Sequence, residues 1–439
     1  MNTKKIIEQG LNKGLTSIEV TTHKSNKLSI SLFNDEIENL TSASDGGLSL
    51  RGLKDGKLGV FSSDRIDNSI IDFALDQVIE NSKYGIPASD DIFLKPGLKY
   101  KKVHTYNPAL ESVTSDQFVK IGKEISSKLH SLDKRIDVVQ TSIEVSSGEV
   151  KVLNSNNLKL SSKSNSLQVV TTIQAKQDKE VVSGFNYEIL TSLEEFNIDK
   201  FVEKALKDVV SQFNGVEVKS GKYDIILNNE CSAILLSIIM EQTSAYQVKN
   251  HLSLFEGKLN QKVMSSKVTV LDKPLAKSIY DVSFDDDCYP TSNKVIIKNG
   301  VLQTYLYDLQ TAKDFNTVTT GNAHASGGKN IPAPFLVSLK KGKLSLDDLC
   351  KKINNGIYVT SLEGVGTGIN SQSGDYSLQG AGYLIENGKL GKYIPLMTVS
   401  GNILKDFNRV GDVGSDSKIT YYGVESPSIS IKKVSISGK

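Results

Sequence analysis

The stretch from Gly364 to Gly391 reads GVGTGINSQSGDYSLQGAGYLIENGKLG, and eight of its 28 residues are glycine. Glycine at this density lets the backbone adopt positive φ and lets another chain approach closely. The second part predicts a hairpin. Residues 382–386 form its first strand, Asn387-Gly388 is a strong turn signal, and residues 389–397 form its second strand. A flexible, hydroxyl-rich loop on a rigid hairpin is typical of a binding site. A plain glycine-rich connection between strands is the alternative.

Around this stretch, the C-terminal half contains many strand signals and few helices. Asn299-Gly300 predicts another hairpin, and residues 418–437 mostly alternate between apolar and polar residues. One buried helix is expected where CSAILLSIIM (231–240) follows a short apolar strand at 223–227. These signals predict a β-rich antiparallel C-terminal domain over residues 215–439.

The N-terminal half shows the same order of elements twice, each time a helix, several strands and a second helix. This order suggests an internal duplication, although coincidence is the alternative. We therefore expect an α+β fold with an N-terminal unit (1–84), a proline-containing linker (85–113), a central unit (114–214) and the C-terminal domain. The expected helices are 4–12, 68–82, 116–132 and 198–213, and the expected strands are 17–22, 27–33, 47–53, 57–62, 137–144, 150–154, 158–162 and 166–175.

Composition excludes several classes of protein. The 52 lysines and arginines balance 50 aspartates and glutamates, whereas a nucleic-acid binder needs a basic surface. No apolar run is long enough to span a membrane, and MNTKKIIEQGLNKG at the N-terminus lacks the apolar core of a secretory signal. Three cysteines without CxxC spacing predict a reduced, cytoplasmic protein.

Five segments carry a resemblance to a known family. They are NDEIENLTSASDGGLSLRGLKDGKLG (34–59), FDDDCYPTSNKVIIKNGVLQTYLYDLQTA (284–312), TTGNA (319–323), SGDYSLQGAGYLIENGKL (373–390) and VSGNI (399–403). In this order they resemble the TldD/PmbA family, once called modulators of DNA gyrase and now viewed as metalloproteases. The resemblance implies an α+β N-terminal part and a β-rich C-terminal domain.

The same resemblance distinguishes two types of subunit. The catalytic TldD type carries HExxxH on a helix and a cysteine near the C-terminus, and such residues can hold zinc while the glutamate activates its water. Here Asn229 and Ile234 stand at the two histidine positions, Glu230 alone matches, and GDVGSDSK (411–418) has no cysteine. This departure implies the PmbA type, also called TldE, with no catalytic residues, no metal and no cofactor of its own.

Other chemistries find little support in the sequence. Asp285, Asp286 and Asp287 have the oxygen ligands of a hard cation, but the expected structure is a solvated acidic turn before Pro290. Cys231, within an apolar helix, is expected to be a core residue. The chain has neither a GxSxG nucleophile elbow nor a Walker lysine, which argues against a serine hydrolase and a nucleotide-binding protein.

The sequence thus predicts a non-catalytic subunit that pairs with a TldD-type catalytic subunit and grips an unfolded peptide, with homodimerisation of the isolated chain left open. The alternative is a stand-alone peptidase or hydrolase whose active site is not recognisable. The residues expected to line the peptide cleft or partner interface are Ser373, Asp375, Tyr376, Ser377, Gly380 and Gly382. Tyr376 is the expected anchor, because tyrosine combines a large apolar body with a polar tip. Its packing beneath the hairpin as a core residue is the competing interpretation.

Overall fold

The structure is a computed structural model that describes residues 2–326 and 329–438. The chain is mixed α+β and divides into two compact units. Unit 1 comprises residues 1–209, 277–291 and 308–330, and unit 2 comprises 210–276, 292–307 and 331–439. Within the described residues, every helix is too short or too polar to cross a membrane.

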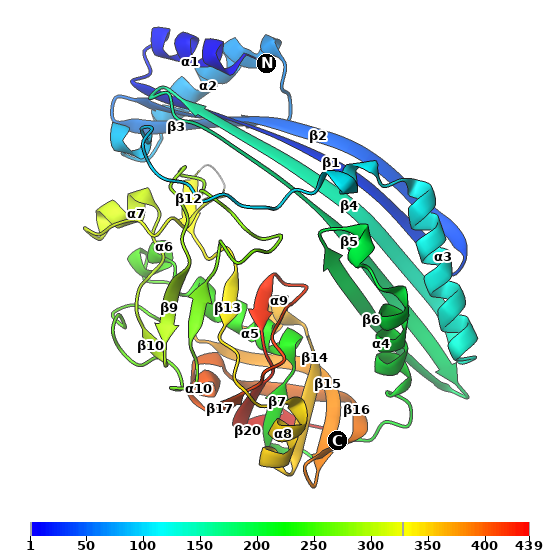
Figure 1. Cartoon of the computed structure of the whole chain (residues 1–439). Helices are drawn as coiled ribbons and strands as arrows, with labels where there is room; N and C mark the ends of the chain where they lie inside the picture. The colour runs from blue at the N-terminus through cyan, green and yellow to red at the C-terminus, as the bar shows by residue number, and fades with distance from the viewer. Residues whose placement is uncertain (1, 327–328, 439) are drawn as a thin grey trace. The chain divides into compact units, whose positions relative to one another are not determined.

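Unit 1 is built on one antiparallel sheet of six strands in the order β3-β2-β1-β4-β5-β6. In Figure 1 the sheet is long and curved, with α1 and α2 at one end and α3 and α4 toward the other. The strands are β1 (Ser17–Phe33), β2 (Glu36–Lys54), β3 (Lys57–Ser63), β4 (Ile136–Asn154), β5 (Lys159–Gln177) and β6 (Glu180–Leu190). The helices are α1 (Thr3–Asn12), α2 (Ile71–Ser82), α3 (Ser115–Leu132) and α4 (Ile198–Val210).

The predicted repetition of helix, strands and helix is confirmed. Each half contributes three strands, and the halves join where β1 pairs with β4. The turns also correspond, because Asn34 and Asn157 have positive φ in the first turn of each half, as Asp55 and Asp178 do in the second. The sequence interval from Asn34 to Asn157 equals that from Asp55 to Asp178, which supports a duplication.

The predicted strands of unit 1 were too short. The expected strands 17–22 and 27–33 are one strand, β1, and the same fusion produces β4 and β5. The middle of β1 is polar and exposed on both faces, so apolar alternation disappears there. Its backbone nevertheless pairs continuously with β2 on one side and β4 on the other, and this pairing keeps the strand intact.

One face of the unit 1 sheet is apolar and lies against the helices. Ile18 and Val20 on β1 are buried in a cluster with residues of α1 and α2, including Ile6 and Leu75. Residues at odd positions of β1 point to the opposite face, because side chains alternate along a strand. Glu19 therefore lies on the face that is not covered by α1 and α2.

Unit 2 contains two six-stranded sheets. One has the order β16-β15-β14-β7-β20-β17, and the other has the order β10-β9-β8-β13-β19-β18. The first sheet consists of β7 (Gly221–Leu227), β14 (Gly356–Glu363), β15 (Asp375–Glu386), β16 (Lys389–Asn402), β17 (Val410–Val413) and β20 (Ile429–Ser437). The second consists of β8 (Val270–Asp272), β9 (Lys294–Lys298), β10 (Val301–Leu302), β13 (Val337–Leu339), β18 (Lys418–Ile419) and β19 (Val424–Ser426).

The predicted hairpin turns are confirmed, but the strand expected at 382–386 already begins at Asp375, in the segment that was expected to be a loop. Asn387 and Gly388 have φ of 50° and 74° and join β15 to β16, and Asn299-Gly300 joins β9 to β10 in the same way. The sheets are not purely antiparallel, however, because β7 pairs with β14 and β13 pairs with β19 in parallel. Parallel partners are far apart in sequence, so no local turn signal reveals them.

Helix α5 (Asn229–Glu241) follows β7 directly and contacts strands of both unit 2 sheets. Its side chains are apolar on most sides, which fits this enclosed position. The remaining short elements are α6 (Ala245–Lys249), α7 (Leu309–Asp314), α8 (Leu346–Ile353), α9 (Val365–Gly368), α10 (Ile403–Asn408), β11 (Ala323–Ser326) and β12 (Lys329–Pro332). The 3-10 turns are η1 (Asn68–Ile70), η2 (Asp90–Ile92), η3 (Pro108–Ser112) and η4 (Leu193–Glu195).

Candidate functional site

The N-terminus of α5 is the place where the resemblance implies a degenerate metal motif. Asn228 caps the helix, because its side chain accepts a hydrogen bond of 2.8 Å from the backbone N–H of Cys231. The side-chain amide of Asn229 donates to the carbonyl oxygens of Asp416 at 2.6 Å and Ser426 at 2.8 Å. Asn229 therefore binds the backbone of the C-terminal segment directly.

Glu230 is paired with a cation from the same C-terminal segment. The ammonium of Lys418 lies 2.9 Å from a Glu230 carboxylate oxygen, and the Glu230 side chain is 19% exposed. Ile234, one turn further along α5, is buried in the apolar core. Two hydroxyls, those of Ser232 and Ser426, share a buried hydrogen bond of 2.8 Å beneath this pair. The side chains at this end of α5 are thus occupied by contacts within the chain.

The residues at this position do not fit a zinc ion. Zinc sites in proteins use thiolate, imidazole and carboxylate ligands. The two motif positions offer an amide and an aliphatic side chain, while the one carboxylate faces a lysine. The neighbouring Cys231 is buried in the apolar core, and this burial raises the pKa of its thiol. No cluster of three or more histidine, cysteine or acidic side chains with metal-ligand geometry occurs within residues 2–326 and 329–438.

The start of β15 and the residues immediately before it present a polar face to solvent. Ser373, Asp375 and Ser377 are exposed, and they alternate with buried neighbours. The Asn402 amide, on β16, donates to the carbonyl of Ser373 at 2.8 Å and to the Asp375 carboxylate at 2.9 Å. The hydrogen bond from Asn402 lowers the pKa of Asp375, so this carboxylate is held charged and in a fixed orientation.

Tyr376 points to the other face of the same strand and is only 4% exposed. Its hydroxyl donates to the buried carboxylate of Asp406 at 2.7 Å, and Asp406 also pairs with Arg409. Burial and the Asp406 charge raise the pKa of the Tyr376 hydroxyl. The position opposite on β16 is Gly401, where an added Cβ would meet both Asp406 and Tyr376. This geometry favours the interpretation of Tyr376 as a core residue.

Gly380 and Gly382 are also buried, and their lack of a side chain serves packing. A Cβ on Gly382 would lie 2.0 Å from the backbone oxygen of Tyr358 on β14. A Cβ on Gly380 would lie 2.9 Å from a methyl group of Val399 on β16. Of the six residues expected at the cleft, the structure therefore presents Ser373, Asp375 and Ser377 together on the exposed face and places the other three inside.

The acidic run in unit 1 was expected to be a solvated turn, and this expectation was wrong for two of its three aspartates, because only Asp286 is exposed. Asp285 is 1% exposed and Asp287 is 5% exposed. The Asp285 carboxylate accepts hydrogen bonds from the backbone N–H groups of Asp287, Tyr289 and Ala323. Burial, together with the nearby Asp287, raises the pKa of Asp285 to about 8. The burial of Asp285 and Asp287 is compensated by hydrogen bonds from backbone N–H groups, whereas the exposed Asp286 accepts from the Ala325 N–H at 2.7 Å.

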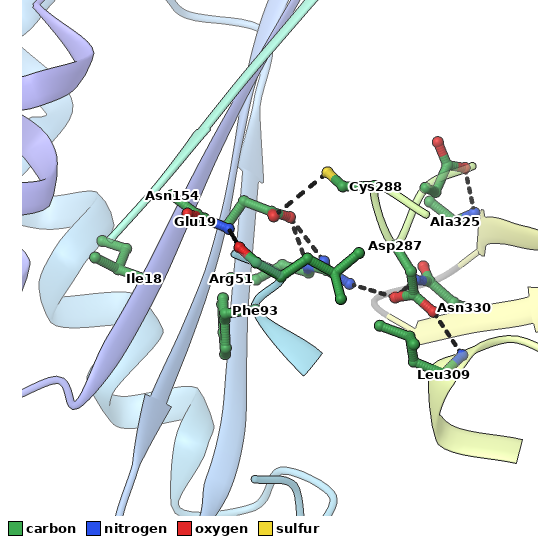
Figure 2. Close-up of polar contacts among 12 residues, drawn as sticks. Ile18, Glu19, Arg51, Phe93, Asn154, Asp287, Cys288, Leu309, Ala325 and Asn330 are labelled. Atoms are coloured by element: carbon green, nitrogen blue, oxygen red, sulfur yellow. Dashed lines mark hydrogen bonds and ion pairs between the residues drawn. The ribbon is translucent and has the colours of Figure 1, made fainter. Parts of the chain in front are cut away.

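Figure 2 shows that Arg51 is at the centre of a buried polar network. The guanidinium of Arg51 donates to Glu19 at 3.0 Å and to Asp287 at 3.1 Å, and it lies 5.9 Å from the centroid of the Phe93 ring. Asp287 accepts further hydrogen bonds from the Asn330 side chain at 2.6 Å and from the Leu309 backbone at 2.9 Å. Glu19 and Arg51 are paired positions on β1 and β2, so the sheet places them side by side.

Sequence reasoning did not find this network. One feature of the sequence pointed to Arg51: it is one of only four arginines in the chain, and it lies in a predicted strand. The nearby Cys288 is a structural residue: its sulfur lies 3.6 Å from Glu19, and burial raises the pKa of its thiol. Burial likewise raises the pKa of Tyr100 to about 12, and the Tyr100 hydroxyl donates to the Cys288 carbonyl. These raised values disfavour a nucleophilic thiolate or phenolate here.

Replacing Tyr376 by phenylalanine removes the hydroxyl and leaves the buried Asp406 carboxylate with one donor fewer. We expect the free energy of unfolding to fall by about 1–3 kcal/mol, measured by urea denaturation. Tyr422→Phe, at a side chain that is 54% exposed, is the matched control and should change stability by less than about 0.5 kcal/mol. Equal stability of both variants would mean that Tyr376 is not a structural anchor.

Replacing Arg51 by methionine keeps much of the side-chain volume but leaves the buried carboxylates of Glu19 and Asp287 without this cationic partner. The expected loss is about 3–5 kcal/mol, measured by the shift of the urea midpoint. Arg65→Met is the control, because the Arg65–Asp67 pair is exposed, at 62% and 50%, and should contribute at most about 1 kcal/mol. A loss at Arg51 no larger than that at Arg65 would contradict the role given to the network.

Comparisons with known proteins agree with this architecture. Residues 19–83 match PmbA/TldA metallopeptidase domain 1, residues 108–213 match the central domain, and residues 220–438 match the C-terminal domain. A metalloprotease PmbA homolog of Buchnera aphidicola is 26% identical, and the alignment covers 96% of this chain and 93% of that protein. An uncharacterized protein of Methanocaldococcus jannaschii is 26% identical over 98% of this chain and 99% of its own length.

Solved structures share the whole fold. A Thermotoga maritima protein described as a candidate modulator of a DNA gyrase superposes with a TM-score of 0.90 at 25% identity, covering 99% of both chains. The TldE structure from Thermococcus kodakarensis superposes with a TM-score of 0.89 at 24% identity, and the superposition covers 99% of this chain and 100% of that one. The three domain matches and these relatives lead to one conclusion: the chain belongs to the PmbA/TldD metallopeptidase family, whose members are related to proteolysis.

Proposed function

We propose that this protein is a non-catalytic subunit of the PmbA/TldE type, which pairs with a TldD-type catalytic subunit in the processing of unfolded peptides. The observation that carries the proposal is the pairing of Asn229 and Glu230 with the C-terminal segment at the start of α5. The names of the family relatives supply the class of reaction, which is proteolysis.

The chemistry of Glu230 supports this assignment. A glutamate serves as a general base only if it lies within hydrogen-bond reach of an activated nucleophile. At Glu230 the nearby cation is the Lys418 ammonium, which pairs with the carboxylate but cannot lower the pKa of a water as a bound metal does. The pair instead joins α5 to β18, and the carboxylate lies in the first turn of α5, where the helix dipole favours negative charge.

The proposed binding surface consists of the exposed residues at the start of β15 and immediately before it. Ser373, Asp375 and Ser377 offer hydroxyls and one oriented carboxylate to an incoming chain. We propose that these three residues contact peptide or partner subunit. The proposed role of Tyr376, Gly380 and Gly382 is indirect, because they hold β15 against β14 and β16.

Glu230→Gln tests the proposal in a complex reconstituted from this chain and a TldD-type partner. Peptide hydrolysis should remain within about twofold of wild type, because the removed charge takes no part in the chemistry. The matched control replaces the glutamate of HExxxH in the partner subunit, which should abolish hydrolysis. Thermal unfolding of the Glu230→Gln chain verifies that it is folded.

A rate loss of about a hundredfold or more in folded Glu230→Gln, at unchanged subunit affinity, would refute the proposal. Hydrolysis by this chain in the absence of any partner, abolished by Glu230→Gln, would refute it as well.

A further inference from the structure

Unit 2 contains a pocket of about 520 Å³ whose lining includes no residue of α5 or β15. This volume is within the range of sites that hold small organic ligands. We call it the lysine pocket, because four of its twelve lining residues are lysines: Lys273, Lys298, Lys340 and Lys341. The remaining lining residues are Thr269, Leu271, Val295, Asn299, Ser338, Leu339, Ser417 and Glu425.

The floor of the lysine pocket is a row of residues across four adjacent strands. Val295 on β9 pairs with Leu271 on β8, Leu271 pairs with Ser338 on β13, and Ser338 pairs with Glu425 on β19. Residues directly opposite one another on neighbouring strands share a face of the sheet. The floor is therefore apolar toward β9 and polar toward β19, and it is set by backbone pairing.

Ser426, the neighbour of Glu425, places its hydroxyl on Ser232 of α5. Successive residues of a strand point to opposite faces, so Glu425 and the lysine pocket lie on the face of β19 away from α5. The Glu425 side chain is thus directed away from the start of α5, although the lining residue Ser417 adjoins Asp416 and Lys418, which contact Asn229 and Glu230.

The charge of the pocket is strongly positive. Its one carboxylate, Glu425, is already paired: the Lys273 ammonium lies 2.7 Å away and the Ser338 hydroxyl donates at 2.6 Å. Lys298 and Lys340 have no acidic side chain within 4.0 Å among the residues that the structure describes. Asn299, at the turn between β9 and β10, interacts with Thr269 at 3.2 Å and closes one side of the pocket.

We propose that the lysine pocket binds a small organic anion, with a carboxylate or phosphate group between Lys298 and Lys340 and an apolar body over Leu271 and Val295. A lysine ammonium is a compact charge that pairs with a carboxylate or a phosphate alike. The features that the pocket selects in a ligand are therefore its negative charge and its apolar body. Val295 is 38% exposed, and an apolar ligand body would cover it. This inference is independent of the proposed function, because it uses no residue of α5 or β15.

Isothermal titration with phenyl phosphate and with benzoate, on the full chain at fixed ionic strength, tests the inference. The two probes share an apolar ring and differ in their anionic group, so their relative affinities identify the anion that the pocket prefers. Inorganic phosphate tests the charge alone. We expect saturable binding of at least one ring-bearing probe, and weaker binding of inorganic phosphate.

The double variant Lys298→Gln/Lys340→Gln should weaken binding of that probe by about tenfold or more. The control removes the same charge elsewhere in unit 2: Lys389→Gln/Lys392→Gln changes two exposed lysines of β16 and should leave affinity within about twofold. Absence of binding by both ring-bearing probes would overturn the inference. So would equal losses in both double variants, or inorganic phosphate binding as tightly as the ring-bearing probes.

Discussion

The buried guanidinium of Arg51 is the interaction on which the interior of unit 1 depends. Charged side chains are stable in an interior only when their charges and hydrogen-bonding groups are paired. The charge of Arg51 is paired with Glu19 on the neighbouring strand and with Asp287, which lies 236 residues further along the chain. The pairing is one of the contacts that join residues 277–291, which lie within the matched C-terminal domain, to unit 1.

Local signals in the sequence predicted much of the fold. Asn387-Gly388, Asn299-Gly300 and Asp55-Gly56 all form tight turns with positive φ, because each pair tolerates the left-handed conformation that a two-residue hairpin requires. Helices with an apolar face were also predicted within a few residues of their ends. The long strands of unit 1 were missed because their polar middle sections carry no alternation, and cross-strand pairing alone keeps them extended.

The candidate site was only partly predictable. The sequence shows that positions 229 and 234 hold asparagine and isoleucine, but the hydrogen bonds from Asn229 to Asp416 and Ser426 join segments that only the fold brings together. The burial of Tyr376 follows from strand alternation, since it shares a face with buried Leu378 while Asp375 and Ser377 face outward. That alternation was available in the sequence, and the glycine-rich context obscured it.

The proposal of a non-catalytic role rests on a lysine that pairs with Glu230 at the N-terminus of α5. The Lys418 ammonium lies 2.9 Å from Glu230, the residue that the resemblance aligns with the glutamate of the metalloprotease motif. The ammonium supplies positive charge to the carboxylate, yet it offers no open coordination position for a water or a substrate carbonyl. The claim therefore concerns one end of one helix and can be tested there directly.

Elemental analysis of the purified chain after dialysis against zinc tests this central claim most directly. The account predicts far less than one zinc per chain, and no protection of the fold against thermal unfolding when zinc is added. One zinc per chain, with X-ray absorption showing tetrahedral nitrogen and sulfur ligands, would contradict it.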